Sequence, residues 1–292
     1  MKKMFFGTAG WSYPDWKGKV YPLQAPDNFD RLRYLSDFVD FIEINSSFYS
    51  YPSVMNANSW SNSVKDKSGF VFSAKLHRDF THNINFPAEG SVSAVKRFLD
   101  ALKNNGNFAC LLAQFPYSFH FTKENRSRAG KIFKAFRGYN VVTEIRHSSW
   151  NCGEAESFLY ENSSGIATID QPERSLNIKP KFHDGSRILY LRLHGRNRES
   201  WFNEKSGRDE RYDYLYSEAE LRPFADGLSH PGILRGYAVG NNHYEGKAFA
   251  NILQLKSMFL KSKTKCPPVM LENYEMLTRY CYADTPVQKK LL

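Results

Sequence analysis

Apolar runs and helix-like segments alternate along the chain. Eight runs rich in apolar and β-branched residues predict strands, and seven longer segments with apolar positions three or four apart predict helices. The predicted strands span residues 4–10, 41–45, 69–76, 108–114, 141–146, 165–170, 188–194 and 236–242, and the predicted helices span 29–38, 54–64, 92–102, 123–136, 154–161, 218–225 and 247–260. This order favours an α/β fold, a single TIM-type (β/α)8 barrel with loop insertions.

The same pattern predicts the domain boundaries. The alternative fold is a doubly wound open sheet, but the sequence GTAG at residues 7–10 lacks the third glycine and the helix start of its nucleotide-binding turn. We therefore predict that residues 1–263 form the barrel, with a polar and aromatic insertion after the seventh strand. The two prolines at 267 and 268 end the last helix, so residues 264–292 are predicted to form a short C-terminal extension packed on the barrel.

Side chains alternate across a strand, so the phase of each strand predicts which residues face the inside of the barrel. In strand 41–45 the two isoleucines share the face toward the helices, which turns Glu43 and Asn45 inward. In strand 188–194 the leucines alternate with Tyr190, Arg192 and His194, which therefore point inward as well. We predict an interior top layer of mixed charge that contains Glu43, Lys75, Glu144, Arg146, Arg192 and His194.

In barrels of this kind, functional side chains meet at the carboxyl ends of the strands. Almost every predicted strand ends in a polar or ionisable residue. The predicted catalytic residues are Glu43, Lys75, Glu144, Arg146, His147, Asp170, Arg192 and His194. The predicted substrate-binding residues are Trp11, Tyr13, Asn45, Tyr49, Gln114, Trp150, Arg196, Asn241, Asn242 and His243. Aromatic rings at the mouth of the barrel can stack on a sugar or a base, and the alternative, favoured for any single ring, is that it only packs its loop against the barrel.

The charged layer suggests a division of roles. We expect Glu43 and Glu144 to act as an acid and base pair, because mixed charge separates the pKa values of neighbouring carboxyl groups. Lys75, Arg146 and Arg192 would stabilise developing negative charge. The alternative is a buried ion network that only closes the barrel.

Two further kinds of chemistry would use the same residues. Oxygen and nitrogen donors on different strands could bind a divalent metal, and these donors are Glu43, Glu144, Asp170, His194 and His243. No closely spaced ligand motif supports this metal site. Lys75 could form a Schiff base if its pKa were lowered, but two neighbouring glutamates predict a raised pKa instead.

A phosphate site is predicted beside the last two strands. The sequence GRNR at 195–198 follows the seventh strand, and NNH at 241–243 precedes Gly246 and the last helix. Barrels bind phosphate at this place, because arginine donates two parallel hydrogen bonds and a helix amino terminus adds its dipole. A solvated basic loop is the alternative.

The composition of the chain indicates what kind of partner it binds and in which compartment it is expected. The 292 residues are 41% hydrophobic and 24% charged, and no apolar run approaches the roughly 20 residues that span a bilayer. Because no signal-peptide core follows the first residues, we expect a cytoplasmic protein without membrane contact. The four cysteines form no close pair, so free thiols are expected. A net charge of +10 with 15% aromatic residues favours an anionic partner.

The motifs at the strand ends resemble those of the YecE-like family, a group of TIM-barrel proteins of unknown function. In chain order they are GTAGWSYPDW (7–16), EINSSFY (43–49), Lys75 with Thr81 and His82, QFP (114–116), EIRHSSW (144–150), Asp170, RLHGR (192–196), and NNH (241–243) with Gly246 and Asn251. The resemblance covers nearly the whole chain up to the last helix. It implies a barrel with a cleft built from these residues and implies no particular reaction. Gly240 stands where the family usually has an aromatic residue, which predicts a larger cleft near Asn241.

Together these features predict an enzyme that uses acid/base or metal-assisted chemistry. Its substrate would be an anionic, polyhydroxylated small molecule, such as a sugar phosphate or a nucleotide derivative. The alternative is a protein that binds or processes nucleic acid, with Arg196, Arg198 and Arg208 along the mouth. A third hypothesis is a non-catalytic binding barrel.

Overall fold

The computed structural model describes residues 3–284, except residues 174, 202, 204–206 and 230–234. Its eight parallel strands are β1 (Lys3–Ala9), β2 (Phe41–Ile44), β3 (Val71–Lys75), β4 (Phe108–Gln114), β5 (Val141–Glu144), β6 (Gly165–Asp170), β7 (Ile188–Leu193) and β8 (Arg235–Gly240). Each strand pairs with the next and β8 pairs with β1, so the sheet is a closed barrel. The predicted α/β barrel is confirmed, with each strand end within two residues of its predicted position.

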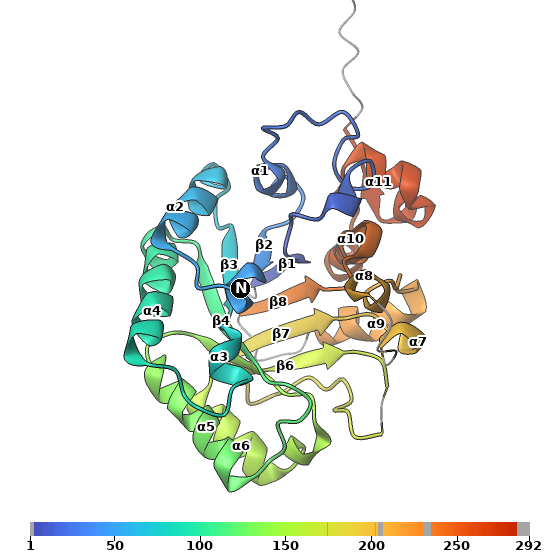
Figure 1. Ribbon diagram of the computed structural model, residues 1–292. Helices are drawn as coiled ribbons and strands as arrows, with labels where there is room; N and C mark the ends of the chain where they lie inside the picture. Colours follow the sequence, from blue (N-terminus) through green and yellow to red (C-terminus); the bar gives the residue numbers. More distant parts are fainter. Residues whose placement is uncertain (1–2, 174, 202, 204–206, 230–234, 285–292) are drawn as a thin grey trace, which may run out of the picture.

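Helices cover the outside of the barrel. They are α1 (Arg31–Leu35), α2 (Val54–Ser63), α3 (Arg78–Thr81), α4 (Glu89–Asn104), α5 (Lys123–Ala135), α6 (Gly153–Asn162), α7 (Arg198–Trp201), α8 (Arg208–Arg211), α9 (Glu218–Gly227), α10 (Lys247–Leu260) and α11 (Pro268–Asn273). Figure 1 shows α2, α4, α5 and α6 one after another around one side of the barrel, with α9 and α10 on the other.

Differences from the predicted helices have local causes. The helix predicted over 29–38 begins later, at Arg31, because the Asp30 side chain accepts the backbone N–H of Arg33 and caps the start of α1; the helix ends at Leu35. The four-residue helix α3 follows β3 and is too short to produce a periodic pattern. Between β6 and β7, the residues that the structure describes contain no helix.

The inside of the barrel has two layers of different polarity. Near the amino ends of the strands, the rings of Phe5 and Phe41 both pack on Tyr237, with ring centroids 5.2 and 5.0 Å apart. These buried rings fill that end of the barrel. The polar layer lies above them, at the carboxyl ends of the strands. The site therefore faces the loops that follow the strands.

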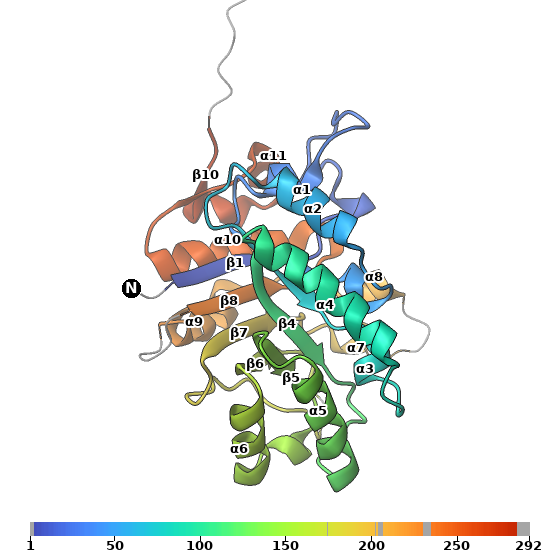
Figure 2. The ribbon, with the colours of Figure 1, turned by 90° about the vertical axis from the view of Figure 1, so that its left-hand side faces the viewer.

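Residues 264–284 pack against α10. This segment contains β9 (Thr264–Lys265), α11, the 3-10 helix η5 (Glu275–Arg279) and β10 (Cys281–Tyr282). Figures 1 and 2 both place α11 near α10 and the loop after β1, where the Asn273 amide donates to the carbonyl of Gly18 at 3.1 Å. Residues 285–292 of the predicted extension lie outside the described part of the chain. No helix of that described part is long and apolar enough to cross a bilayer.

Candidate active site

A buried ion network occupies the polar layer of the barrel. Arg192 on β7 donates through Nη2 to Oε1 of Glu43 on β2, at 2.7 Å, and through Nη1 to Oε2 of Glu144 on β5. Each of the three side chains is at most 1% exposed. The strand phase had predicted that these residues point into the barrel, and the structure brings them together there.

A second arginine holds the other oxygen of Glu144. Nε and Nη2 of Arg146 each lie 2.9 Å from Oε1 of Glu144. Burial alone would raise the pKa of Glu144, but Arg192 and Arg146 together lower it well below the ordinary value. Glu144 therefore stays ionised, which makes it a poor carrier of protons at neutral pH.

Lys75, at the end of β3, has a different environment from the two arginines. Its Nζ lies 3.9 Å from the centroid of the Phe48 ring. Among the residues that the structure describes, no carboxylate oxygen lies within 4.0 Å of this nitrogen. Burial, and to a smaller extent the charge of Arg192, lowers the pKa of Lys75 to about 7, although the charge of Glu144 opposes this effect. The raised pKa expected from the sequence is therefore wrong, because desolvation outweighs the carboxylates.

His194, just beyond β7, is an uncharged member of the site. Burial, followed by the charge of Arg192, lowers the pKa of His194 to about 3. Its Nε2 lies 3.3 Å from Nη1 of Arg192, and its Nδ1 lies 2.9 Å from the side-chain amide of Asn241. The imidazole is thus neutral at physiological pH and fixed at both nitrogens.

A cavity of about 90 Å³ opens above the network. It is lined by Tyr13, Asn45, Tyr49, Lys75, Gln114, Arg146, Arg192, His194, Tyr212, Asn241 and His243. A space of this size holds several water molecules. Within the described structure, two buried polar atoms at the cavity residues, Oδ1 of Asn45 and Nε of Arg192, have no hydrogen-bond partner. A small polar ligand or water would satisfy them.

Loops from opposite ends of the chain form one wall of the cavity. The ring of Tyr13 stacks on that of His243 with centroids 4.5 Å apart, and Tyr212 packs against His243 at 4.9 Å. Below them, Nε1 of Trp16 donates to the carbonyl of His243 at 2.7 Å. Tyr212 was missed by the sequence analysis, because it lies in the irregular insertion after β7, where no periodicity shows which way a side chain points.

One arginine of the predicted phosphate loop, Arg196, is paired with two carboxylates. Arg196 donates from Nε and Nη2 to Asp170, at 2.9 and 3.0 Å, and from Nη1 to Glu220 at 3.1 Å. The hydroxyl of Tyr216 also donates to Asp170, at 2.5 Å. Asp170 and Arg196 line a separate pocket of about 690 Å³ rather than the central cavity. The side chain of Arg208, predicted to lie along the mouth, is outside the described structure.

Three other predicted site residues lie away from the cavity. Trp150 is 2% exposed and donates from Nε1 to the carbonyl of Phe119 at 2.7 Å, so the prediction that it stacks on a substrate at the mouth is wrong. Asn242 is fully buried and donates to Oδ1 of Asn251 at 3.0 Å. His147 stacks on His120, with ring centroids 3.9 Å apart. These side chains hold loops in place.

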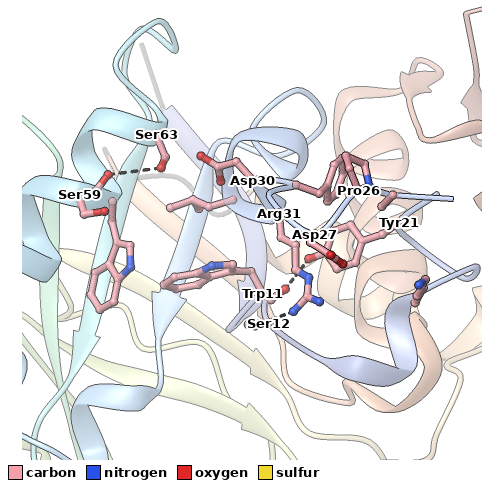
Figure 3. Close-up of a pocket in the computed structure, with 14 residues that line it drawn as sticks. Trp11, Ser12, Tyr21, Pro26, Asp27, Asp30, Arg31, Ser59 and Ser63 are labelled. Carbon is pink, nitrogen blue, oxygen red and sulfur yellow. Dashed lines mark hydrogen bonds between the residues drawn. The ribbon is translucent and has the colours of Figure 1, made fainter. Parts of the chain in front are cut away.

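Trp11 lies in a second pocket, between the loop after β1 and α2. Figure 3 shows Trp11, Ser12 and Arg31 on one side of this pocket and Ser59 and Ser63 of α2 on the other. The pocket has a volume of about 570 Å³, and Trp11 packs edge to face on Trp60 at 5.3 Å. The sequence placed Trp11 in the central cleft, whereas the structure separates it from that cleft.

The cleft prediction at Gly240 is wrong, and the carboxylates considered as possible metal ligands are already bound by arginines. A Cβ on Gly240 would lie 2.7 Å from the carbonyl oxygen of Ala248, so this position faces α10 and does not enlarge the cleft. Within the described residues, no three His, Cys, Asp or Glu side chains come together as a metal site. Arginines occupy the oxygens of Glu43 and Glu144 that the metal hypothesis required.

Comparison with known proteins identifies relatives over most of the chain. The sequence model described as "Protein of unknown function DUF72" matches residues 5–273. The UPF0759 protein YunF of Bacillus subtilis is 25% identical over 241 residues, which are 77% of this chain and 83% of that protein. The crystal structure of a DUF72 family protein from Thermotoga maritima has a TM-score of 0.76 and 29% identity, covering 88% of this chain and 99% of that one. A DUF72 family protein from Enterococcus faecalis has the same TM-score at 21% identity, covering 91% and 98%.

Proposed function

This chain belongs to the DUF72 family of proteins of unknown function, and we propose that it is an enzyme that transfers protons on a small, anionic, polyhydroxylated substrate. The observation that carries the proposal is Lys75, a half-buried amine that lines the cavity and has no carboxylate partner among the described residues; its pKa, lowered to about 7, lets it accept and release a proton near neutral pH. This assigns the acid/base role to Lys75 rather than to Glu144, whose carboxylate stays ionised.

The lining of the cavity supports the proposed substrate class. Amide and hydroxyl groups from Asn45, Gln114, Asn241, Tyr13 and Tyr212 offer donors and acceptors for several hydroxyl groups of a ligand. The anionic group would bind Arg146, because Glu144 takes only Nε and Nη2 of this guanidinium. Since the cavity is small, a sugar phosphate or nucleotide derivative would place its reacting end inside and extend past the exposed Tyr49 ring.

A thermal-shift panel tests the ligand class. The panel contains sugar phosphates, nucleotides, inorganic phosphate and a short single-stranded oligonucleotide. We expect a phosphorylated polyol to raise the melting temperature, because a ligand that binds only the folded state adds about 2.7 kcal/mol at 100 times its Kd. The shift should disappear in Arg146→Gln and persist in Arg97→Gln, which removes an exposed arginine on α4.

Proton transfer is then measured on the ligand that shifts the melting temperature. In D2O, we expect the wild-type protein to exchange a C–H of the ligand for deuterium, and Lys75→Met to slow this exchange by roughly 100-fold or more. A shift with the oligonucleotide alone would contradict the proposal and favour a nucleic-acid partner. Equal exchange in both proteins would exclude Lys75 as the proton carrier.

A further inference from the structure

We propose that Lys75 is also a nucleophile, which forms an imine with a short carbonyl compound that carries an anionic group. This inference rests on the proposed function, because it assigns covalent chemistry to the same cavity. It goes further in naming the reacting bond of the substrate and the atom of the protein that attacks it.

The contacts of Lys75 leave its nitrogen accessible to a ligand. In the described part of the chain no carboxylate pairs with Nζ. Arginines hold both oxygens of Glu144 and Oε1 of Glu43, and the hydroxyl of Tyr190 donates to Oε2 of Glu43 at 2.8 Å. Nζ lies over the Phe48 ring on one side, and Lys75 lines the cavity. The lowered pKa agrees with this geometry, since an amine must be neutral to act as a nucleophile.

The size and charge of the cavity define the class of carbonyl compound. A volume of about 90 Å³ admits the carbonyl end of a short molecule. Arg146 lines the same cavity, and no described residue accepts a hydrogen bond from its Nη1. A carboxylate or phosphate close to the carbonyl group would bind there. The class therefore includes short 2-oxo acids and short phosphorylated ketones or aldehydes.

The covalent step needs no oxidant or reductant. The nitrogen lone pair of Lys75 attacks the carbonyl carbon, a C–N bond forms, and the π electrons of the C=O bond move to oxygen. A proton passes from nitrogen to that oxygen and gives a carbinolamine. The hydroxyl group then takes up a proton from the solvent and leaves as water, while the nitrogen lone pair forms the C=N bond. The resulting protonated imine withdraws electrons from the adjacent carbon and so acidifies its C–H bond. The imine thus promotes exchange of that C–H by withdrawing electrons, and in this form Lys75 is no longer the group that accepts the proton.

Reductive trapping tests the inference. The wild-type protein is incubated with sodium cyanoborohydride and pyruvate, dihydroxyacetone phosphate or acetone, and the product is analysed by intact mass and peptide mapping. We expect a single secondary-amine adduct at Lys75, formed with at least one of the two anionic compounds roughly tenfold faster than with acetone. The comparison of pyruvate with the phosphate distinguishes a carboxylate from a phosphate as the anionic group.

Two lysine variants serve as the matched pair. Lys75→Met should abolish the adduct, whereas Lys123→Met, the same change at an exposed lysine on α5, should leave it unchanged. Adducts spread over exposed lysines, with equal yield in Lys75→Met, would overturn the inference. If a small anion raises the melting temperature through Arg146 and no adduct forms, the nucleophile is wrong and the proposed function stands. If neither occurs, both fail.

Discussion

At the scale of single residues, the barrel interior separates two kinds of buried charge. The guanidinium of Arg192 bridges Glu43 and Glu144, which raises the pKa of Arg192 and helps to lower that of Glu144. Lys75 shares this interior but has no such partner among the described residues, so desolvation outweighs the attraction of the more distant carboxylates. The barrel interior therefore contains a stabilised ion network beside an amine whose charged form is disfavoured, and such perturbed groups are common at functional sites.

The cost of burying Lys75 should depend on pH. The folded pKa is about 7 and the ordinary value is 10.5, so between these values the unfolded chain holds a proton that the folded protein has released. The free energy of unfolding of the wild type therefore rises with pH across this window, and the full cost is present below pH 7. We expect Lys75→Met to be more stable than the wild type by about 2–4 kcal/mol near pH 6 and by less near pH 9.5. Urea denaturation at both pH values measures this, and a difference that does not change with pH would contradict it.

Replacement of Glu144 should lower the free energy of unfolding, in contrast to replacement of Lys75. Glu144→Gln leaves the buried Arg192 with only one carboxylate, and breaking a buried pair in this way costs about 3–5 kcal/mol. The control is Glu154→Gln, which removes the exposed partner of Arg126 and should cost less than about 1 kcal/mol. Urea denaturation of the two variants tests this difference, and equal small losses would show that the network does not stabilise the barrel.

At the scale of elements, the junction of β8 and α10 fixes one wall of the site. The loop between them carries His243, and the β1 loop holds it through Trp16 and Tyr13. Gly240 allows α10 to approach β8 closely, since a Cβ there would meet the Ala248 carbonyl at 2.7 Å. The absence of a side chain at this position thus serves helix packing and leaves the cleft unchanged.

Gly240→Ala should therefore destabilise the protein. The added methyl group meets backbone that cannot move without shifting α10, and we expect a loss of about 1–3 kcal/mol. Gly130→Ala is the matched control, because Gly130 lies inside α5 with open space around it. That change should stabilise the protein by about 0.4–1 kcal/mol. Melting temperatures measure both, and a loss in Gly130→Ala equal to that in Gly240→Ala would argue against the packing explanation.

At the scale of the whole molecule, residues 264–284 pack on the outside of the closed barrel, against α10. Met270, Cys266, Leu277 and Cys281 are buried, and α10 is covered by the barrel on one side and by this segment on another. The hydroxyl of Tyr274 donates to the carbonyl of Glu245 at 2.7 Å, beside the loop that carries His243. The segment thus stabilises the helix and the loop behind the site.

Removal of one buried side chain tests this role. Leu277→Ala should cost about 2–5 kcal/mol, because Leu277 is completely buried in the core. Leu260→Ala, at the half-exposed end of α10, is the control and should cost well under that amount. Urea denaturation compares the two. Similar small losses would mean that the segment packs only loosely on the barrel.

The sequence by itself determined the barrel and the residues that point into it. Alternation along a strand is a local property of the backbone, so the positions of Glu43, Glu144, Arg192 and His194 followed from the strand phase alone. The number and order of the strands followed in the same way from periodicity, which needs no knowledge of distant contacts.

Only the tertiary structure decided which of these residues are paired and which are open to a ligand. The direction of the Lys75 pKa shift depends on the balance between desolvation and neighbouring charges. Likewise, only the folded structure places Asp170 and Glu220 against Arg196. Trp150 is buried, and its indole donates a hydrogen bond to the carbonyl of Phe119, a loop residue that is distant in sequence. These outcomes depend on distances between side chains from different strands and loops, and those distances are set only when the chain is folded.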